Sequence, residues 1–375
     1  SNTRKVSLNF FYCESWVISI FFTGFLLFET SLFYPSNVQT VMAQENKLEE
    51  QIEEDIVNEL PSEIEVEDVD FSIVTQEVNV QATNNDESIS INFDLNSDSA
   101  LSLSEDALTM TSKSQEEDSQ EYSLFFGTID QKELYDNAIQ KDEALLESIS
   151  AQLEETPVEV LSEIELGANN IQEVDDSSEL NQIESNLLES EKLIESGELV
   201  LSSVEELEDS SVVVTNLKTN ESFEVNQTDG VASFAFAIPA GIAITTAVGK
   251  TLIAAGAAII VGGGIALSLD KISTNSKTRN NNFNHFKVLR VNSKLYSTGG
   301  VSQKSAIARM MLGADVWSNS QSGAKTVASS TSLNLGGSKT PIGPERDKNK
   351  SGYYRHYHTN PRKKSGGHSF YGGPA

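Results

Sequence analysis

Three of the chain's four histidines lie within the last 20 residues, at His356, His358 and His368. Histidine has the unperturbed pKa nearest neutrality, so two imidazoles can divide the work of general base and general acid. Metal-free RNA cleavage needs this chemistry, because one imidazole takes the proton of the ribose 2′-hydroxyl and another protonates the leaving oxygen. The three histidines are therefore predicted to be catalytic.

Charged and aromatic residues next to the histidines are predicted to assist them. Arg355 is assigned to catalysis because it can neutralise charge on a phosphate. The residues expected to bind phosphates or stack on bases are Tyr353, Tyr354, Tyr357, Arg362, Lys363 and Lys364. Glu345 and Asp347 are supporting candidates that could orient an imidazole or act as a base, although either could also be an ordinary loop residue.

The same residues allow two other interpretations. A His-x-His pair with a third, distant histidine is also a zinc ligand set, and aromatic strands around a basic turn are also typical of a purely structural hairpin. The residue types favour catalysis without a cofactor. Zinc at the histidines is kept as an alternative.

The segment that carries the histidines is expected to form a β-hairpin. Its parts are a strand at 353–358, a basic turn at 359–366 and a returning strand at 367–371. With a period of two, His356 and His358 share one face with Tyr354, and Arg355 falls on the other. His368 reaches the histidine face if the register allows it.

Upstream residues complete a small α+β module at 286–375. The stretch from Phe286 suits a strand and a turn, and Ser302 is a good N-cap for a helix over QKSAIARMML. A second short helix is expected at 321–329, followed by a long loop that leads to the hairpin.

The motifs GPERDKNKSGYYRHYH and GGHSFYGG resemble the C-terminal signature of a Gram-positive family of secreted toxins. The resemblance covers roughly the last hundred residues and rests on the HYH and GHSFYG elements. It implies a polymorphic-toxin arrangement, in which a toxin module follows export and delivery segments and an immunity protein neutralises it. The positions matched are Pro344, Glu345, Tyr354, His356, His358, Gly367, His368, Phe370, Tyr371 and Gly372.

Charge divides the chain into two contrasting regions. Residues 44–230 hold 50 acidic and 6 basic residues, whereas residues 271–375 hold 3 acidic and 17 basic ones. Residues 44–130 are predicted to have little order, and residues 131–230 to form amphipathic helices and a hairpin. Because the charges are opposite, the acidic region is expected to mask the basic module.

Residues 231–269 form a nearly uncharged block, which predicts a hydrophobic helical hairpin in contact with a membrane. A buried, Ala/Gly-rich core pair and a single re-entrant element are the alternatives. A polar linker at 270–285 joins this block to the C-terminal module.

The N-terminus has the order of a bacterial signal peptide at 1–43: Arg4 and Lys5, an apolar run, then Val41-Met42-Ala43 as a cleavage site. An uncleaved signal anchor is the alternative, and either one predicts a secreted or cell-surface protein. The single cysteine, Cys13, lies in this segment, so the mature chain can form no internal disulfide.

Together these features predict a multi-region chain. A mostly disordered or helical acidic pre-region and a hydrophobic helical hairpin precede a small α+β module that ends in a β-hairpin. The leading functional hypothesis is a secreted toxin that cleaves RNA as a metal-independent ribonuclease. The alternatives are a pore-forming toxin that acts through residues 231–269 and a non-enzymatic surface-binding protein.

Overall fold

The computed structural model describes residues 36–73, 75–85, 87–94, 108–114, 118–153, 188–201, 203–226, 237–261, 263–271, 283–291, 294–347, 352–362 and 367–374. The chain divides into two compact units, residues 1–47 and 48–375. Helix α2 (Ser36–Glu59) begins in the first unit and ends in the second. The apolar core of the predicted signal peptide lies outside the described residues, so export stays a prediction.

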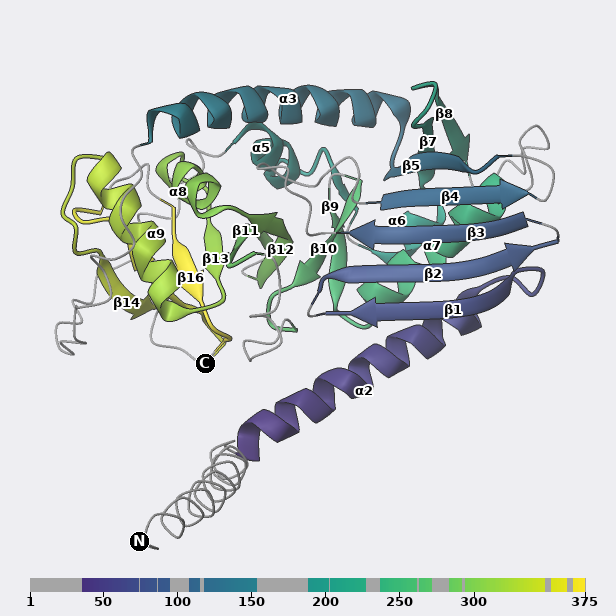
Figure 1. Cartoon of the computed structure of the whole chain (residues 1–375), viewed down its shortest axis with the longest axis horizontal. Coiled ribbons are helices and arrows are strands. Elements are labelled where there is room, and N and C mark those ends of the chain that lie inside the picture. Colours follow the sequence, from purple (N-terminus) through teal and green to yellow (C-terminus); the bar gives the residue numbers. More distant parts are fainter. Residues whose placement is uncertain are drawn as a thin grey trace, which may run out of the picture. The chain divides into compact units, whose positions relative to one another are not determined.

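In the part of the chain that the structure describes, seven antiparallel strands form the first sheet, in the order β1-β2-β3-β4-β5-β7-β8 (Figure 1). The strands are β1 (Glu65–Ser72), β2 (Glu77–Asn84), β3 (Glu87–Asp94), β4 (Leu108–Ser114), β5 (Gln120–Phe126), β7 (Ser211–Asn216) and β8 (Ser222–Asn226). The pair β7–β8 confirms the hairpin that was predicted in the acidic region.

The prediction of little order at 44–130 is wrong, because β1 to β5 bury one apolar face. Val78, Val80, Ile89 and Ile91 alternate with more exposed residues and are at most 2 % exposed. They belong to one core cluster with residues of helix α7 (Ala237–Ala254), more than 140 positions later in the chain. The sequence of the acidic segment alone therefore does not reveal that α7 covers this face.

Residues 231–269 do not form the predicted helical hairpin. The first half contains α7, which is long and apolar enough to cross a membrane but is 72 % buried within the protein. The second half forms two antiparallel strands, β9 (Ala258–Val261) and β10 (Gly264–Ser268). Gly256 and Gly263 have φ values of +65° and +80°, so they end the helix and turn the chain.

The glycines inside α7 serve packing against protein. A Cβ at Gly241 would collide with the sulfur of Met110 in β4, so the helix can approach the sheet closely only with glycine there. For the half of residues 231–269 that contains α7, the structure thus agrees with the alternative of a buried, Ala/Gly-rich core. Contact with a membrane stays a prediction.

Among the described residues, nine strands form the second sheet, in the order β14-β15-β16-β13-β11-β12-β10-β9-β6. Its remaining strands are β6 (Val200–Leu201), β11 (His285–Val291), β12 (Lys294–Val301), β13 (Val316–Ser318), β14 (Ile342–Arg346), β15 (Arg355–His358) and β16 (Ser369–Tyr371). All described pairs are antiparallel except β13–β16. Because β6, β9 and β10 precede residue 270, the sheet extends beyond the predicted module boundary.

Several predictions for the C-terminal part are confirmed. Ser302 caps helix α8 (Gln303–Met311) by accepting a hydrogen bond from the Ser305 amide. The expected second helix is present as α9 (Gln321–Asn334), and β15 pairs with β16 as a hairpin. Part of the predicted loop is instead the edge strand β14, which pairs with β15.

Two helices of the acidic region, α3 (Ile129–Gln152) and α5 (Glu189–Glu195), pack directly on helix α8 of the basic part of the chain, whereas α6 (Val204–Glu208) packs on α7. Asp142 of α3 accepts hydrogen bonds from the first amides of α5, and Glu191 of α5 forms an ion pair with Arg309 of α8. Asp142, Glu191 and Arg309 are each at most 3 % exposed, so this contact is a buried part of the fold.

Removing one charge of the Glu191–Arg309 pair is expected to destabilise the protein. Glu191→Gln leaves the Arg309 guanidinium facing a neutral amide, which should lower the unfolding free energy by roughly 3 kcal/mol. The double variant Glu191→Leu/Arg309→Met, which replaces both charges by apolar side chains, should lower it less. Burial raises the pKa of Glu191 to about 7 despite Arg309, so urea unfolding is compared at about pH 8.5, where the carboxylate is ionised. An unfolding free energy for Glu191→Gln equal to wild type would contradict this.

The fourth histidine, His285, is buried where β11 meets β13. Its Nδ1 lies 2.9 Å from the Ser318 hydroxyl, and burial lowers its pKa to about 4. Between pH 6.5 and 4 the unfolded chain therefore takes up a proton that folded His285 refuses, and stability falls as the pH falls.

Replacing His285 should remove this part of the pH dependence. From pH 6.5 to 4 the wild type should lose about 3 kcal/mol more unfolding free energy than His285→Asn, whose amide can still bond Ser318. Denaturant unfolding of both chains across this range measures the difference. Parallel curves would show that His285 does not titrate differently on folding.

Candidate functional site

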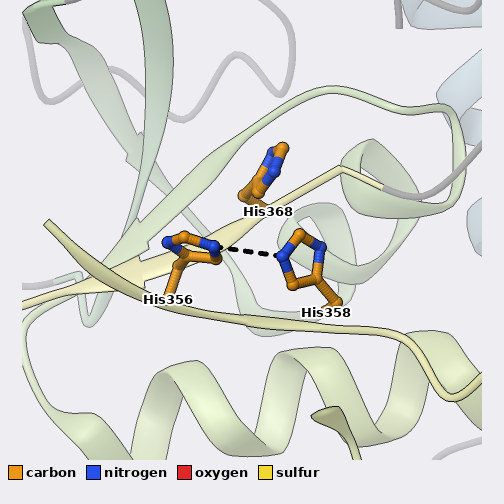
Figure 2. A group of neighbouring side chains, drawn as sticks. All are labelled: His356, His358 and His368. Atoms are coloured by element: carbon orange, nitrogen blue, oxygen red, sulfur yellow. Dashed lines mark hydrogen bonds between the residues drawn. The ribbon is translucent and has the colours of Figure 1, made fainter. Parts of the chain in front are cut away.

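The hairpin brings the three C-terminal histidines together. His356 and His358 lie on β15, and His368 lies immediately before β16 on the neighbouring strand (Figure 2). The Nε2 atoms of His356 and His358 are 3.0 Å apart, and one ligand nitrogen from each histidine lies within 4.8 Å of the others. The predicted shared face is thus confirmed, including the position of His368.

Each of these histidines has a carboxylate beside it. His368 Nδ1 is 2.8 Å from Asp315 Oδ1, His356 Nε2 is 3.5 Å from Asp347 Oδ1, and His358 Nε2 is 3.6 Å from Glu345 Oε2. Asp315, Glu345 and Asp347 are the only acidic residues between positions 271 and 375. All the negative charge of the basic segment is therefore placed at the histidines.

Two arginines bind two of these carboxylates, Asp315 and Glu345. Arg290 of β11 donates to Asp315 Oδ2 at 2.7 Å, and its guanidinium lies 5.7 Å from the centre of the Phe370 ring. Arg362 forms an ion pair with Glu345. The site is thus a compact set of histidines, carboxylates and arginines.

Burial decides the protonation of the imidazoles. His356 is fully buried, and His358 and His368 are 5 % and 6 % exposed. Burial lowers the pKa of His356 to about 3, and burial together with the other histidines lowers that of His358 further. Although burial alone would raise the pKa of Asp315, Arg290 and His368 hold it well below its usual range. At neutral pH, His356 and His358 are neutral and Asp315 is ionised.

This buried histidine triad could hold a metal ion. Neutral imidazole is the form that binds metals, and three histidines with one open position make a typical catalytic zinc site. Zinc–nitrogen bonds of about 2.05 Å at tetrahedral angles place ligand nitrogens roughly 3.3 Å apart. The 3.0 Å separation of the His356 and His358 Nε2 atoms is close to this spacing.

Other predicted site residues do not join the cluster. Arg355 is exposed on the opposite face of β15, across from Tyr371. Tyr354 packs on Phe370, and Tyr357 is buried against α9, where Gln321 donates to its hydroxyl. Neither ring is presented to a substrate in this structure.

The remaining predicted binding residues have different outcomes. Tyr353 is half-buried. Arg362 lies beside Glu345 at the cluster, whereas Lys363 and Lys364 lie outside the described residues. Both supporting candidates lie beside histidines, Asp347 beside His356 and Glu345 beside His358.

Sequence reasoning missed Asp315 and Arg290, which reach the site from β13 and β11. Both lie more than 50 residues before His368, so spacing along the hairpin could not reveal them. One signal was available, because residues 271–375 are basic and contain only three acidic residues. Treating each of the three as a candidate site residue would have included Asp315.

Comparisons with family models, curated proteins and solved structures found no match to this chain, so its site is interpreted from its own geometry.

Proposed function

We propose that this protein is an exported bacterial toxin whose C-terminal sheet cleaves RNA at a zinc-type metal centre held by His356, His358 and His368. The observation that carries the proposal is the pairing of each histidine with one of the only three carboxylates of a basic segment. Such a cluster offers metal ligands, proton acceptors and phosphate-binding cations within one small volume.

A metal centre suits these histidines better than the metal-free acid–base pair. A general acid must hold a proton near the working pH, but burial keeps His356 and His358 neutral. A zinc-type ion held by the three imidazoles would supply a Lewis acid for a phosphoryl oxygen. The proton transfers then pass to the carboxylates.

Asp347 is the best candidate for the proton acceptor. Its side chain is 23 % exposed, more than those of Glu345 and Asp315, so a substrate can reach it. In the proposed reaction it takes the proton of the ribose 2′-hydroxyl while the O2′–P bond forms and the P–O5′ bond breaks. The products are a 2′,3′-cyclic phosphate and a 5′-hydroxyl, because the leaving O5′ takes a proton from solvent water and Asp347 then releases its proton to solvent.

Arg362 and the lysines that follow it are assigned to the substrate phosphates. Arginine forms bidentate hydrogen bonds with phosphate, and the excess positive charge after residue 271 attracts a polyanion. Because Arg362 already pairs with Glu345, a bound phosphate would share this guanidinium. The charge of the segment favours RNA over an uncharged substrate.

Export and neutralisation belong to the same proposal. The N-terminal pattern and the toxin-family resemblance support secretion, and they imply an immunity protein in the producing cell. Masking by the acidic region is supported by the buried contact between α5 and α8. Membrane contact by residues 231–269 is a weaker candidate, because α7 is largely covered by protein.

Metal binding is the first expected outcome. The purified full chain, loaded with zinc and dialysed, should retain about one ion per chain. His358→Asn should lose most of it because one of three ligands is gone, whereas His285→Asn should retain it. Elemental analysis measures the content, and circular dichroism confirms that both variants are folded. A wild-type chain without zinc would overturn the metal centre.

RNA cleavage is the second expected outcome. The zinc-loaded full chain should cut single-stranded RNA to products with 2′,3′-cyclic phosphate ends. His358→Asn or Asp347→Asn should lower the cleavage rate by roughly 100-fold or more. His285→Asn is the matched control. A DNA oligonucleotide of the same sequence, which lacks the 2′-hydroxyl, should resist cleavage.

The results separate the parts of the proposal. A zinc-loaded chain that leaves RNA intact would show that RNA is the wrong substrate. Cleavage that persists at full rate with a chelator present would show that the metal is not needed.

A further inference from the structure

Asp315 makes three polar contacts with two strands. Its Oδ1 accepts hydrogen bonds from the backbone amide and the ring Nδ1 of His368, both at 2.8 Å, and its Oδ2 accepts from Arg290 at 2.7 Å. The side chain is 11 % exposed. One carboxylate thus fixes both the backbone and the ring of a single histidine.

The register of the sheet creates this arrangement. Parallel pairing of β13 with β16 sets Val316 opposite Ser369, and the Val316 amide donates to the His368 carbonyl. The residues that precede these, Asp315 and His368, are therefore side by side. Arg290 comes from β11, which pairs with the other edge of β13.

The shorter contact at Nδ1 decides the tautomer of His368. Nδ1 lies 2.8 Å from Asp315 Oδ1 and 3.2 Å from Nη2 of Arg290. An ionised carboxylate has no proton to give, so the closer contact with Asp315 places the hydrogen on Nδ1. In the neutral imidazole, Nε2 then keeps its lone pair. Oriented in this way, the neutral His368 ring would offer its Nε2 as the ligand nitrogen.

We infer that Asp315, held by Arg290, is a positioning residue that orients His368 as a metal ligand. This inference rests on the metal centre proposed above and names the residues that support it. Such outer partners set ring orientation and raise the basicity of the ligand nitrogen. Asp315 itself does not touch the proposed substrate.

Arg290 completes the support from two sides. It binds the second oxygen of Asp315, and it lies over the Phe370 ring, which in turn stacks on His368 at a centroid distance of 5.4 Å. Carboxylate, guanidinium and phenyl ring therefore restrict His368 together. A lysine at position 290 would keep the charge but lose the planar fork.

His356 has a comparable outer partner. Its Nδ1 lies 3.4 Å from the Tyr354 carbonyl oxygen, which can only accept a hydrogen bond. An Nδ1–H at His356 likewise leaves the lone pair on Nε2, the nitrogen that faces His358. Two of the three histidines are thus preset by acceptors on the side away from the cluster.

The tautomer can be tested directly without any metal. With only four histidines, the full chain labelled with ¹⁵N-histidine gives few ring signals, and His368→Asn assigns the one in question. Wild-type His368 is expected as the Nδ1–H tautomer near pH 7.5. Asp315→Ala should convert it to a mixture or to the Nε2–H form, and Asp315→Glu should restore it in part.

Metal affinity provides the second readout. Asp315→Asn should weaken zinc binding about 10-fold to 100-fold while the stoichiometry stays at one, as expected for an outer partner. Competition with a coloured chelator measures the affinity. Asp142→Asn is the matched control, because it also removes a buried carboxylate, but one that caps α5, and it should leave zinc affinity unchanged.

The outcomes distinguish the two proposals. Wild-type affinity in Asp315→Asn, or an unchanged tautomer in Asp315→Ala, would overturn the role of Asp315 and leave the metal centre standing. A wild-type chain that binds no zinc would overturn both. Equal losses in Asp315→Asn and Asp142→Asn would show that general destabilisation, and not positioning, causes the effect.

Discussion

The parallel pair β13–β16 is the constraint on which the site depends. It joins the C-terminal hairpin to β11, and it places Asp315 against His368 and Arg290. Without this pair, the hairpin would still bring His356, His358 and His368 together, but His368 would lack Asp315 and Arg290 as partners. The most important contact of the site is therefore made by a residue outside the segment that contains the histidines.

The same dependence on distant partners extends to the rest of the chain. The basic C-terminal part shares its sheet with β6, β9 and β10 and buries Arg309 against Glu191 of the acidic region. A fragment that begins at the predicted linker would lose these strands and leave a buried arginine without that carboxylate. The acidic region is accordingly part of the fold, whatever further role its charge has.

Local features were predictable from sequence, and non-local ones were not. The N-cap Ser302, the β7–β8 hairpin and the alternation of His356 and His358 follow from short-range rules. The first sheet was missed because the apolar face of β2 and β3 is completed by α7, far along the chain. Asp315 and Arg290 were missed for the same reason, since pairing between strands, not spacing, brings them to His368.

Metal binding and acid–base catalysis make opposite demands on an imidazole. A nitrogen that ligates a metal must keep its lone pair, so it cannot also carry the proton of a general acid. Burial and outer acceptors both favour the unprotonated nitrogen at His356. In the proposed reaction, proton transfer would then fall to the carboxylates, of which Asp347 is the most exposed at 23 %. A substrate would therefore approach from the carboxylate side, with the histidines behind it in the protein.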